Sequence, residues 1–271
     1  MLKVVLSLAL AYAGLCALLW YAQESLLFYP QPAARAPAAP PAWTLEAVAI
    51  EAADGTRLAG VLVKPPVVRP PVVIYFGGNA EEVTSFAPLA EHTYGQSALL
   101  LVNYRGYGAS QGRPGEAALV ADALAIHDWA RARADLDGHR ILAHGRSLGS
   151  GVAVQLAGAR PLRAVVLTSP YDSLVAVARA HYPWAPAGLL LRHRFDSLAR
   201  APALKVPALF VIAEADTLIA PAHSDRLRAA WGGATEVFRI PGRGHNDLDA
   251  DPGLAAAIVA FARRHLAPAA P

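Results

Sequence analysis

The pentapeptide Gly-Arg-Ser-Leu-Gly at residues 145–149 constrains this chain more than any other segment. It lies where an apolar run typical of a β-strand gives way to a run typical of a helix. Such a tight strand-to-helix turn lifts the serine hydroxyl out of the fold, and glycines flank it because a Cβ would collide there. The free N–H groups at the start of the helix face the place where a negative oxygen would form. We therefore predict Ser147 as a nucleophile and the N–H of Leu148 as one stabilising donor.

Strands and helices alternate through the domain predicted at residues 43–271. Two early strands, at 46–51 and 56–63, flank the turn Asp54-Gly55 and predict a hairpin. Buried strands follow at 72–76, 98–103, 140–143, 164–168, 208–213 and 236–240, and the clearest helices at 116–133 and 252–265. This alternation predicts an α/β fold whose mostly parallel sheet carries helices on both faces, with the hairpin as its antiparallel edge.

Residues 169–207 interrupt this alternation, because nearly forty residues is long for a plain connection between two strands. The segment has no strand pattern and is rich in aromatic residues and leucine, so we expect a small helical cap at about 170–206, above the site. Its large apolar side chains would either line an acyl pocket or pack the cap onto the sheet. They are Tyr182, Trp184, Leu189, Leu190, Leu191 and Phe195.

The N-terminal segment is apolar from residue 4 to residue 22 except for Ser7, and it follows Lys3. Nineteen helical residues extend about 28 Å, close to the hydrocarbon thickness of a bilayer. We expect a single-pass membrane anchor at 1–25 followed by an extended proline- and alanine-rich spacer at 26–42. A buried core helix and a cleaved signal peptide are the alternatives; the bulky Trp20 fits a cleavage site poorly.

The charge pattern gives an expected orientation and excludes several classes of partner. Lys3 is the only basic residue before the apolar segment, so we expect the domain to lie on the extracytoplasmic side of the membrane. The net charge of +3, without a run of Lys or Arg, does not indicate a nucleic-acid partner. Cys16 is the single cysteine, and the nine histidines lack metal-ligand spacing, so no metal or other cofactor is expected.

A serine nucleophile needs a histidine base and a carboxylate that orients the base, and the expected chain order is serine, acid, histidine. Asp216 follows the predicted strand at 208–213, and His245 follows the predicted strand at 236–240. The carboxyl ends of parallel strands meet at one edge of the sheet, so these side chains can converge on Ser147. We expect His245 to be the general base and then the acid, and Asp216 to fix its tautomer.

Other residues compete for these roles. Glu214 and Asp172 are alternative acids, since one lies two residues from Asp216 and the other follows the preceding predicted strand. His144 is near Ser147 in sequence but precedes the turn, where a packing role is favoured. The second oxyanion donor is expected in the loop Gly77-Gly78-Asn79-Ala80, with Asn79 as first choice and Gly78 as second. This loop lacks both common phosphate-binding glycine patterns.

Several segments of the chain resemble those of a known family. The segments that carry the resemblance are 75–80 (Tyr-Phe-Gly-Gly-Asn-Ala), 103–112 (Asn-Tyr-Arg-Gly-Tyr-Gly-Ala-Ser-Gln-Gly), 144–151 (His-Gly-Arg-Ser-Leu-Gly-Ser-Gly), 169–173, 244–247, Asp216 with Pro221 after it, and 26–30 after the apolar segment. They are similar to the α/β-hydrolase superfamily and, within it, to the small membrane-anchored abhydrolase-domain serine hydrolases. The resemblance implies Ser147, Asp216 and His245 as a catalytic triad. One departure is Gly77, where the family usually has histidine.

The resemblance implies an esterase, thioesterase or depalmitoylase-like activity. We therefore expect a membrane-tethered serine hydrolase that cleaves small acyl esters or thioesters through an acyl-enzyme. A serine peptidase of aminopeptidase type on the same fold is the first alternative, because an acyl-enzyme route also serves amides. A binding protein that keeps the fold without catalysis is the second.

Overall fold

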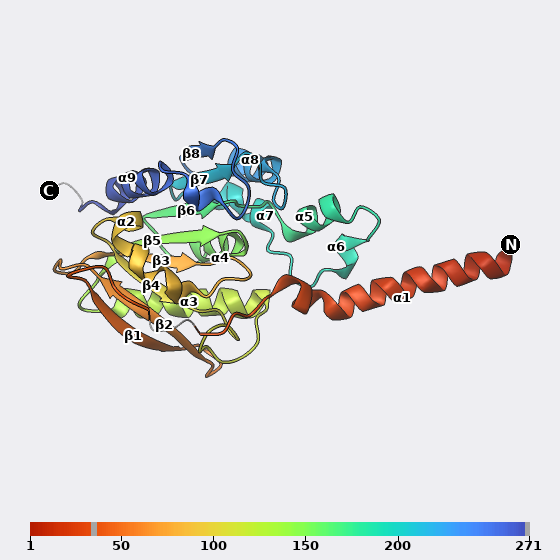
Figure 1. The fold of residues 1–271 in the computed structure, drawn as a ribbon, viewed down its shortest axis with the longest axis horizontal. Coiled ribbons are helices and arrows are strands. Elements are labelled where there is room, and N and C mark those ends of the chain that lie inside the picture. Colours follow the sequence, from red (N-terminus) through yellow and green to blue (C-terminus); the bar gives the residue numbers. More distant parts are fainter. Residues whose placement is uncertain (34–36, 269–271) are drawn as a thin grey trace.

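The computed structural model describes residues 1–33 and 37–268, and within them eight strands form one sheet in the order β1-β2-β4-β3-β5-β6-β7-β8 (Figure 1). The pairs β1/β2 and β2/β4 are antiparallel, and all other neighbours are parallel. The strands are β1 (Thr44–Glu51), β2 (Arg57–Lys64), β3 (Pro71–Phe76), β4 (Ala98–Val102), β5 (Asp137–Arg146), β6 (Ala164–Thr168), β7 (Ala208–Ala213) and β8 (Thr235–Ile240). The predicted α/β-hydrolase fold, a mostly parallel sheet with an antiparallel hairpin at its edge, is confirmed.

Helices cover both faces of the sheet because the central strands are apolar on both sides. In β3, Ile74 faces the core that includes α3 and α4, whereas Val73 and Tyr75 face the core that includes α2 and α9. The helices of the domain are α2 (Ala90–Tyr94), α3 (Glu116–Ala132), α4 (Leu148–Ala157), α5 (Leu174–His181), α6 (Ala187–Leu190), α7 (Ser197–Arg200), α8 (Pro221–Ala230) and α9 (Leu254–Leu266). Short 3-10 turns lie at Val83–Leu89, Ala201–Ala203 and Leu248–Ala250.

The N-terminal helix α1 (Leu2–Leu27) extends away from the domain (Figure 1). Its mean hydropathy reaches 2.1 over 18 residues, and none of that window is buried, so it is long and apolar enough to cross a membrane. The helix runs two residues into the segment predicted as a spacer. Part of that predicted spacer, residues 34–36, and the last three residues of the predicted domain, 269–271, lie outside the described residues.

The chain directly after α1 packs on the domain and does not form a free tether. Phe28 is buried, and its ring meets that of His193 edge-on at 5.3 Å between centroids. The N–H of Tyr29 donates to the carbonyl of Asn79 at 3.0 Å, and the carbonyl of Gln31 accepts from Gly108 at 2.8 Å. The first part of the predicted spacer therefore holds the end of α1 against the domain.

The segment between β6 and β7 is helical, as expected for a cap. It contains α5, α6 and α7, and in Figure 1 α5 and α6 lie beside the C-terminal half of α1. Of its large apolar side chains, Phe195 is fully buried against α4, whereas Tyr182, Trp184 and Leu189 are exposed. The last three therefore neither pack the cap onto the sheet nor line a closed pocket.

A buried ion pair ties the loop after β4 to α3. Arg105 donates from Nε and Nη2 to the two carboxylate oxygens of Asp122, at 2.6 and 2.7 Å. The two side chains are only 8% and 4% exposed, and Arg105 also pairs with Asp54, so it is the Asp122 charge that depends on this ion pair. The same loop carries Tyr104 and Tyr107, which contact the site described below.

Replacing Arg105 with methionine should lower the free energy of unfolding by about 3–5 kcal/mol, because Asp122 is then left as a buried, unpaired charge. Urea denaturation followed by tryptophan fluorescence measures the change. Arg160→Met is the matched control: its pair with Asp128 is at the surface, and stability should change little. Adding Asp122→Leu to Arg105→Met should recover much of the loss. An equal, small effect of the two single variants would contradict this role.

Candidate active site

Ser147 occupies a strained turn between the end of β5 and the start of α4. Its φ of 50° and ψ of −117° place a non-glycine residue in a rarely populated region of backbone conformation. Two contacts hold this geometry: the N–H of Ser147 donates to the carbonyl of Thr168 at 2.9 Å, and the hydroxyl of Ser150 donates to the carbonyl of Ser147 at 2.7 Å. The turn directs the Ser147 side chain toward the edge where the parallel strands end.

The two glycines of the pentapeptide permit the close packing around this turn. A Cβ at Gly145 would overlap the backbone of Gly149, and a Cβ at Gly149 would overlap the carbonyl of Phe76 at the end of β3. Backbone atoms cannot move aside as a flexible side chain can, so both positions require glycine. The glycine spacing that the sequence shows is thus explained by contacts between β5, α4 and β3.

His245 lies between Ser147 and Asp216. Its Nε2 is 2.9 Å from the Ser147 hydroxyl oxygen, and its Nδ1 is 2.7 Å from a carboxylate oxygen of Asp216. The loops after β7 and β8 bring the acid and the histidine together. Two backbone hydrogen bonds connect these loops. The N–H of Glu214 donates to the carbonyl of Ile240 at 3.0 Å, and the N–H of residue 215 donates to the carbonyl of residue 243 at 2.9 Å. The structure thus brings all three residues expected as a triad into one hydrogen-bonded row.

Asp216 is buried and ionised. Burial raises the pKa of its carboxyl, but the hydrogen bonds from His245, Ile219 and Leu218 outweigh burial, and the net pKa is lowered. The amides of Leu218 and Ile219 donate to one carboxylate oxygen at 2.9 and 2.8 Å, which leaves the other oxygen for His245. A carboxylate at Nδ1 favours the tautomer with its proton there, so Nε2 is free to accept the proton of Ser147.

The loop after β3 lies directly beside the serine. A Cβ built on Gly78 would be 3.8 Å from Cβ of Ser147. The N–H of Gly78 is already engaged, since it donates to the carboxylate of Glu81 at 2.5 Å. In the part of the chain that the structure describes, the N–H groups of Asn79 and Leu148 have no hydrogen-bond acceptor. Asn79 and Leu148 thus keep free donors beside the serine, and Gly78 does not.

Glu81 fills the space at Gly77, the position where the family that the chain resembles usually carries histidine. A Cβ at Gly77 would meet Oε2 of Glu81 at 3.0 Å and the side chain of Val83 at 2.7 Å. The second carboxylate oxygen of Glu81 accepts from the hydroxyl of Tyr75 at 2.7 Å. Glu81 therefore holds the loop from a position four residues after Gly77, a contact that the sequence analysis missed.

Asn79 also links the site to the end of α1. Its side-chain amide donates to the carbonyl of Leu27 at 3.1 Å, and its carbonyl accepts from the hydroxyl of Tyr107 at 2.6 Å. The hydroxyl of Tyr104 donates to the carbonyl of Gly77 at 2.9 Å. Both tyrosines thus hold the loop through its carbonyls; in the sequence their only sign was the Tyr-Arg-Gly-Tyr-Gly of the motif at 103–108.

The alternative acids lie in other contacts. Glu214 is 43% exposed and faces Arg239. The buried carboxylate of Asp172 accepts from the buried His223 and the half-exposed Arg226, both at 2.7 Å, at the base of the cap. Burial raises the pKa of Asp172. The hydrogen bonds from His223 and Arg226 lower it by more, so the net pKa lies below its usual value. Among the described residues His245 bonds with Asp216 and not with Asp172 or Glu214.

His144 is a buried, neutral residue on the far side of the turn. Its Nδ1 lies 2.7 Å from the hydroxyl of Tyr94 and its Nε2 lies 2.9 Å from the hydroxyl of Thr168. Burial, with a smaller effect of the Arg146 charge, lowers the pKa of His144 to about 3. These partners fit the packing role predicted for this histidine.

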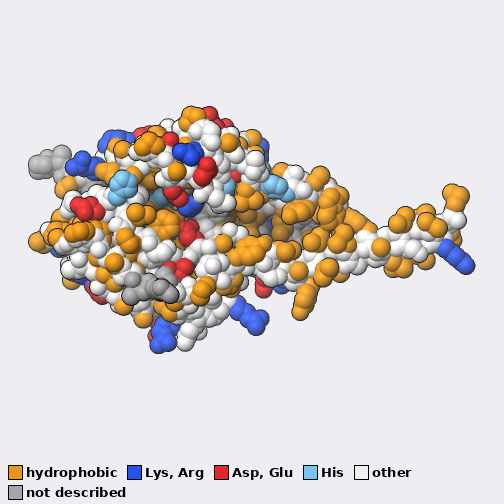
Figure 2. All heavy atoms as spheres, in the orientation of Figure 1, with side chains coloured by type: hydrophobic (Ala, Val, Ile, Leu, Met, Phe, Trp, Pro, Cys, Tyr) orange, Lys and Arg blue, Asp and Glu red, His pale blue; other side chains and the backbone are white. Residues whose placement is uncertain are grey.

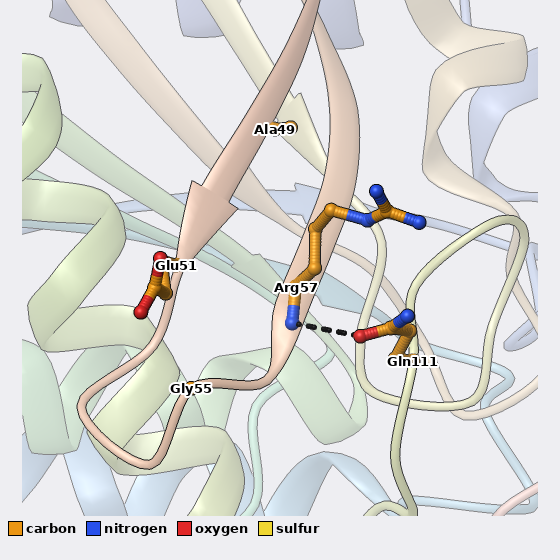
Figure 3. A pocket seen from close by; sticks show the side chains of 5 residues that line it. All are labelled: Ala49, Glu51, Gly55, Arg57 and Gln111. Atoms are coloured by element: carbon orange, nitrogen blue, oxygen red, sulfur yellow. Dashed lines mark hydrogen bonds between the residues drawn. The ribbon is translucent and has the colours of Figure 1, made fainter.

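The described residues contain no metal centre, and the depression at the hairpin is remote from Ser147. Within residues 1–33 and 37–268, no group of three His, Cys, Asp or Glu side chains could hold a metal ion. A shallow depression of about 360 Å³ lies at the β1/β2 hairpin, where the N–H of Arg57 donates to the side chain of Gln111 (Figure 3). Strands β4 and β3 separate this hairpin from the strand that leads to Ser147.

The sequence model of the alpha/beta hydrolase fold matches residues 71–206. The chain is 37% identical over 250 residues to the uncharacterized protein Rv2307c of Mycobacterium tuberculosis, covering 91% of this chain and 88% of that protein. It is 27% identical over 202 residues to the alpha/beta hydrolase domain-containing protein WAV2 of Arabidopsis thaliana, covering 68% and 66% of the two chains.

Solved structures show the same architecture. Acetyl xylan esterase 1 from Thermoanaerobacterium sp. JW/SL YS485 is similar with a TM-score of 0.71 at 15% identity, covering 93% of this chain and 94% of that one. The Pyrococcus furiosus esterase Pf2001 is similar with a TM-score of 0.68 at 17% identity, covering 88% and 98%. At these identities the likeness is one of fold.

The His144→Gln variant should lose less unfolding free energy than wild type when the pH is lowered. In the native chain His144 takes up a proton only near pH 3, whereas an unfolded histidine does so near pH 6.5. The unfolded state therefore binds more protons between these values. The unfolding free energy should fall as the pH drops, by up to about 1.4 kcal/mol per pH unit from this group. Urea denaturation at pH 7, 6 and 5 should show wild type losing about 2 kcal/mol more than the variant. Parallel pH dependences would contradict a buried neutral His144.

Proposed function

The chain belongs to the alpha/beta hydrolase fold family, and on that premise we propose that it is a membrane-associated serine hydrolase of esterase or thioesterase type. The observation that supports this most is the position of His245, within hydrogen-bond distance of both Ser147 and Asp216. A base in contact with the serine and an acid in contact with the base are the two relations that serine attack requires. The esterases among the similar solved folds agree with this choice of substrate.

The proposed reaction proceeds in two halves. Oγ of Ser147 attacks the acyl carbonyl carbon while Nε2 of His245 takes the hydroxyl proton, and Asp216 stabilises the charged imidazole. The tetrahedral oxyanion lies between the N–H groups of Leu148 and Asn79. Collapse breaks the bond to the alcohol or thiol, which leaves with the proton from His245, and the acyl group stays on Ser147. Water then loses a proton to His245, attacks the acyl-enzyme, and releases the carboxylic acid and the free serine.

We further propose that α1 anchors the domain in a membrane, with the domain on the extracytoplasmic side. The length and hydropathy of α1 support an anchor, and Lys3 supports the orientation. Asn79 donates to the carbonyl of Leu27, the last residue of α1, so the proposed oxyanion loop is next to the helix end. A substrate with an acyl chain in the adjacent lipid would therefore have a short path to Ser147.

Ser147→Ala should lower kcat by several orders of magnitude without unfolding the protein, because its side chain adds nothing to the core. Asp216→Asn should cost about 10⁴-fold, since the histidine then takes the wrong tautomer. Asp172→Asn is the matched control at a second buried aspartate that also contacts a histidine, and its folded fraction should keep most of its kcat. Steady-state hydrolysis of p-nitrophenyl butyrate measures all three. A larger loss for Asp172→Asn than for Asp216→Asn would assign the acid to Asp172.

Substrate preference should favour p-nitrophenyl esters and thioesters of short to medium acyl chains over aminoacyl amides. The rate should fall in acid, across the range in which histidines gain a proton. The measurement is kcat/KM for both substrate classes, and its pH profile, with the purified full chain in detergent. Faster cleavage of aminoacyl amides than of every acyl ester would replace the esterase with a peptidase. Turnover of neither class, with a folded protein, would favour a binding protein.

A further inference from the structure

A stretch of the cap at residues 182–191 has the composition of a membrane segment. Its sequence, Tyr-Pro-Trp-Ala-Pro-Ala-Gly-Leu-Leu-Leu, contains no charged and no amide side chain. Tyr182, Trp184 and Leu189 are 56%, 49% and 84% exposed, respectively. We call these ten residues the cap tip. Figure 2 shows that hydrophobic side chains gather where the cap meets α1 and continue along the helix.

The cap tip runs along the side of α1. At one end, the side-chain amide of Gln23 donates to the carbonyl of Leu190 at 3.1 Å, and its oxygen accepts from the N–H of Arg192 at 2.7 Å. At the other end, the hydroxyl of Tyr12 donates to the carbonyl of Trp184 at 2.9 Å. Positions 12 and 23 of a helix are about 16 Å apart along its axis. The cap tip therefore lies beside α1 from position 12 to position 23.

Most backbone N–H groups of the cap tip donate within the cap, and three of its carbonyls accept from side chains outside it, those of Tyr12, Gln23 and Arg194. The amides of residues 182, 185, 187, 189, 190 and 191 all donate to carbonyls within residues 178–187. The two prolines have no N–H to satisfy. Among the described residues of this stretch only Trp184 and Gly188 have an N–H without an acceptor. Backbone N–H groups in hydrocarbon need an acceptor within the protein, because no water is there to accept a hydrogen bond. Six of the eight N–H groups of the cap tip meet this requirement.

We propose that the cap tip enters the hydrocarbon of the bilayer in which α1 is anchored, as a second membrane-embedded element beside that helix. The proposal rests on the anchoring role proposed for α1. Tyr12 lies near the middle of the apolar stretch at 4–22, so a bilayer that covers this stretch also covers Trp184. A bilayer at this depth covers the exposed apolar side chains and agrees with the pairing of most N–H groups of the cap tip.

Polar residues mark where the bilayer surface crosses this pair of elements. Glu24 is 3.4 Å from Arg192 and 3.6 Å from His193, and the Arg192 guanidinium stacks 4.9 Å from the ring centre of Trp20. Tryptophan and arginine are typical of the interface between headgroups and acyl chains. This level coincides with the end of α1 that contacts Asn79, so the oxyanion loop lies just above the headgroups. The cap tip then orients the domain with its active site toward the membrane.

The depth of the cap tip can be measured with a label on Leu189. The full chain carries Cys16→Ala to remove its single cysteine, and a bimane fluorophore is attached to Leu189→Cys. After reconstitution in phosphatidylcholine–phosphatidylglycerol vesicles, quenching by brominated lipids and by aqueous iodide is compared. Leu8→Cys in α1 is the control for hydrocarbon, and Val68→Cys, a residue 91% exposed on the domain, is the control for water.

Brominated lipid should quench the label at 189 to within about twofold of position 8, and iodide should quench it at least fivefold less than position 68. Iodide quenching equal to that at 68 would overturn the proposal. Protection from both quenchers would overturn it too, by showing a second copy or another protein over the cap tip. Water exposure at both 8 and 189 would contradict the anchoring of α1. The quenching measurement does not depend on turnover. A protein that is inactive but has its label at position 189 in the lipid would contradict only the proposed hydrolase activity.

Discussion

The approach of α4 to the end of β3 is the constraint on which the rest of the site depends. Gly149 contacts the carbonyl of Phe76 so closely that no other residue fits. This packing fixes where the helix begins, which in turn forces Ser147 to a positive φ. Such a conformation costs a non-glycine residue about 1–3 kcal/mol. The cost is offset by the bonds to Thr168 and Ser150, and the result is a serine presented to His245 next to free N–H groups.

The same loop connects the candidate site to α1. Asn79 carries the N–H proposed for the oxyanion, while its side chain and carbonyl bind Leu27, Tyr29 and Tyr107. A displacement of α1 would therefore be transmitted to the oxyanion loop through direct hydrogen bonds. In the described residues the end of α1 contacts the loop directly, so the position of α1 and the geometry of the candidate site are coupled.

Much of the fold could be predicted because it depends on local patterns. The apolar runs predicted the strands to within a few residues, and the helix predicted at 116–133 is observed as α3, Glu116–Ala132. The proximity of Ser147, Asp216 and His245 could be expected because parallel strands end at one edge. Their catalytic roles stay predictions. The glycines at 145 and 149 predicted the turn between them.

The remaining features depend on contacts between distant segments, which no local pattern reports. Proline and alanine after α1 predicted an extended spacer, and the sequence did not show that Phe28 and Tyr29 contact the domain. Glu81 occupies the space at Gly77 only because the chain turns back there. The composition of the cap showed that its side chains are apolar. It could not show that Trp184 faces outward beside α1, since that depends on how two elements 170 residues apart meet.

Covalent labelling tests the nucleophile most directly. The full chain is treated with a fluorophosphonate, digested, and analysed by mass spectrometry to locate the adduct. We predict one adduct, on Ser147, that forms quickly in wild type, slowly in His245→Ala and not at all in Ser147→Ala. A protein that is folded but unlabelled, or an adduct on any other residue, would contradict the assignment of Ser147 as the nucleophile of a serine hydrolase.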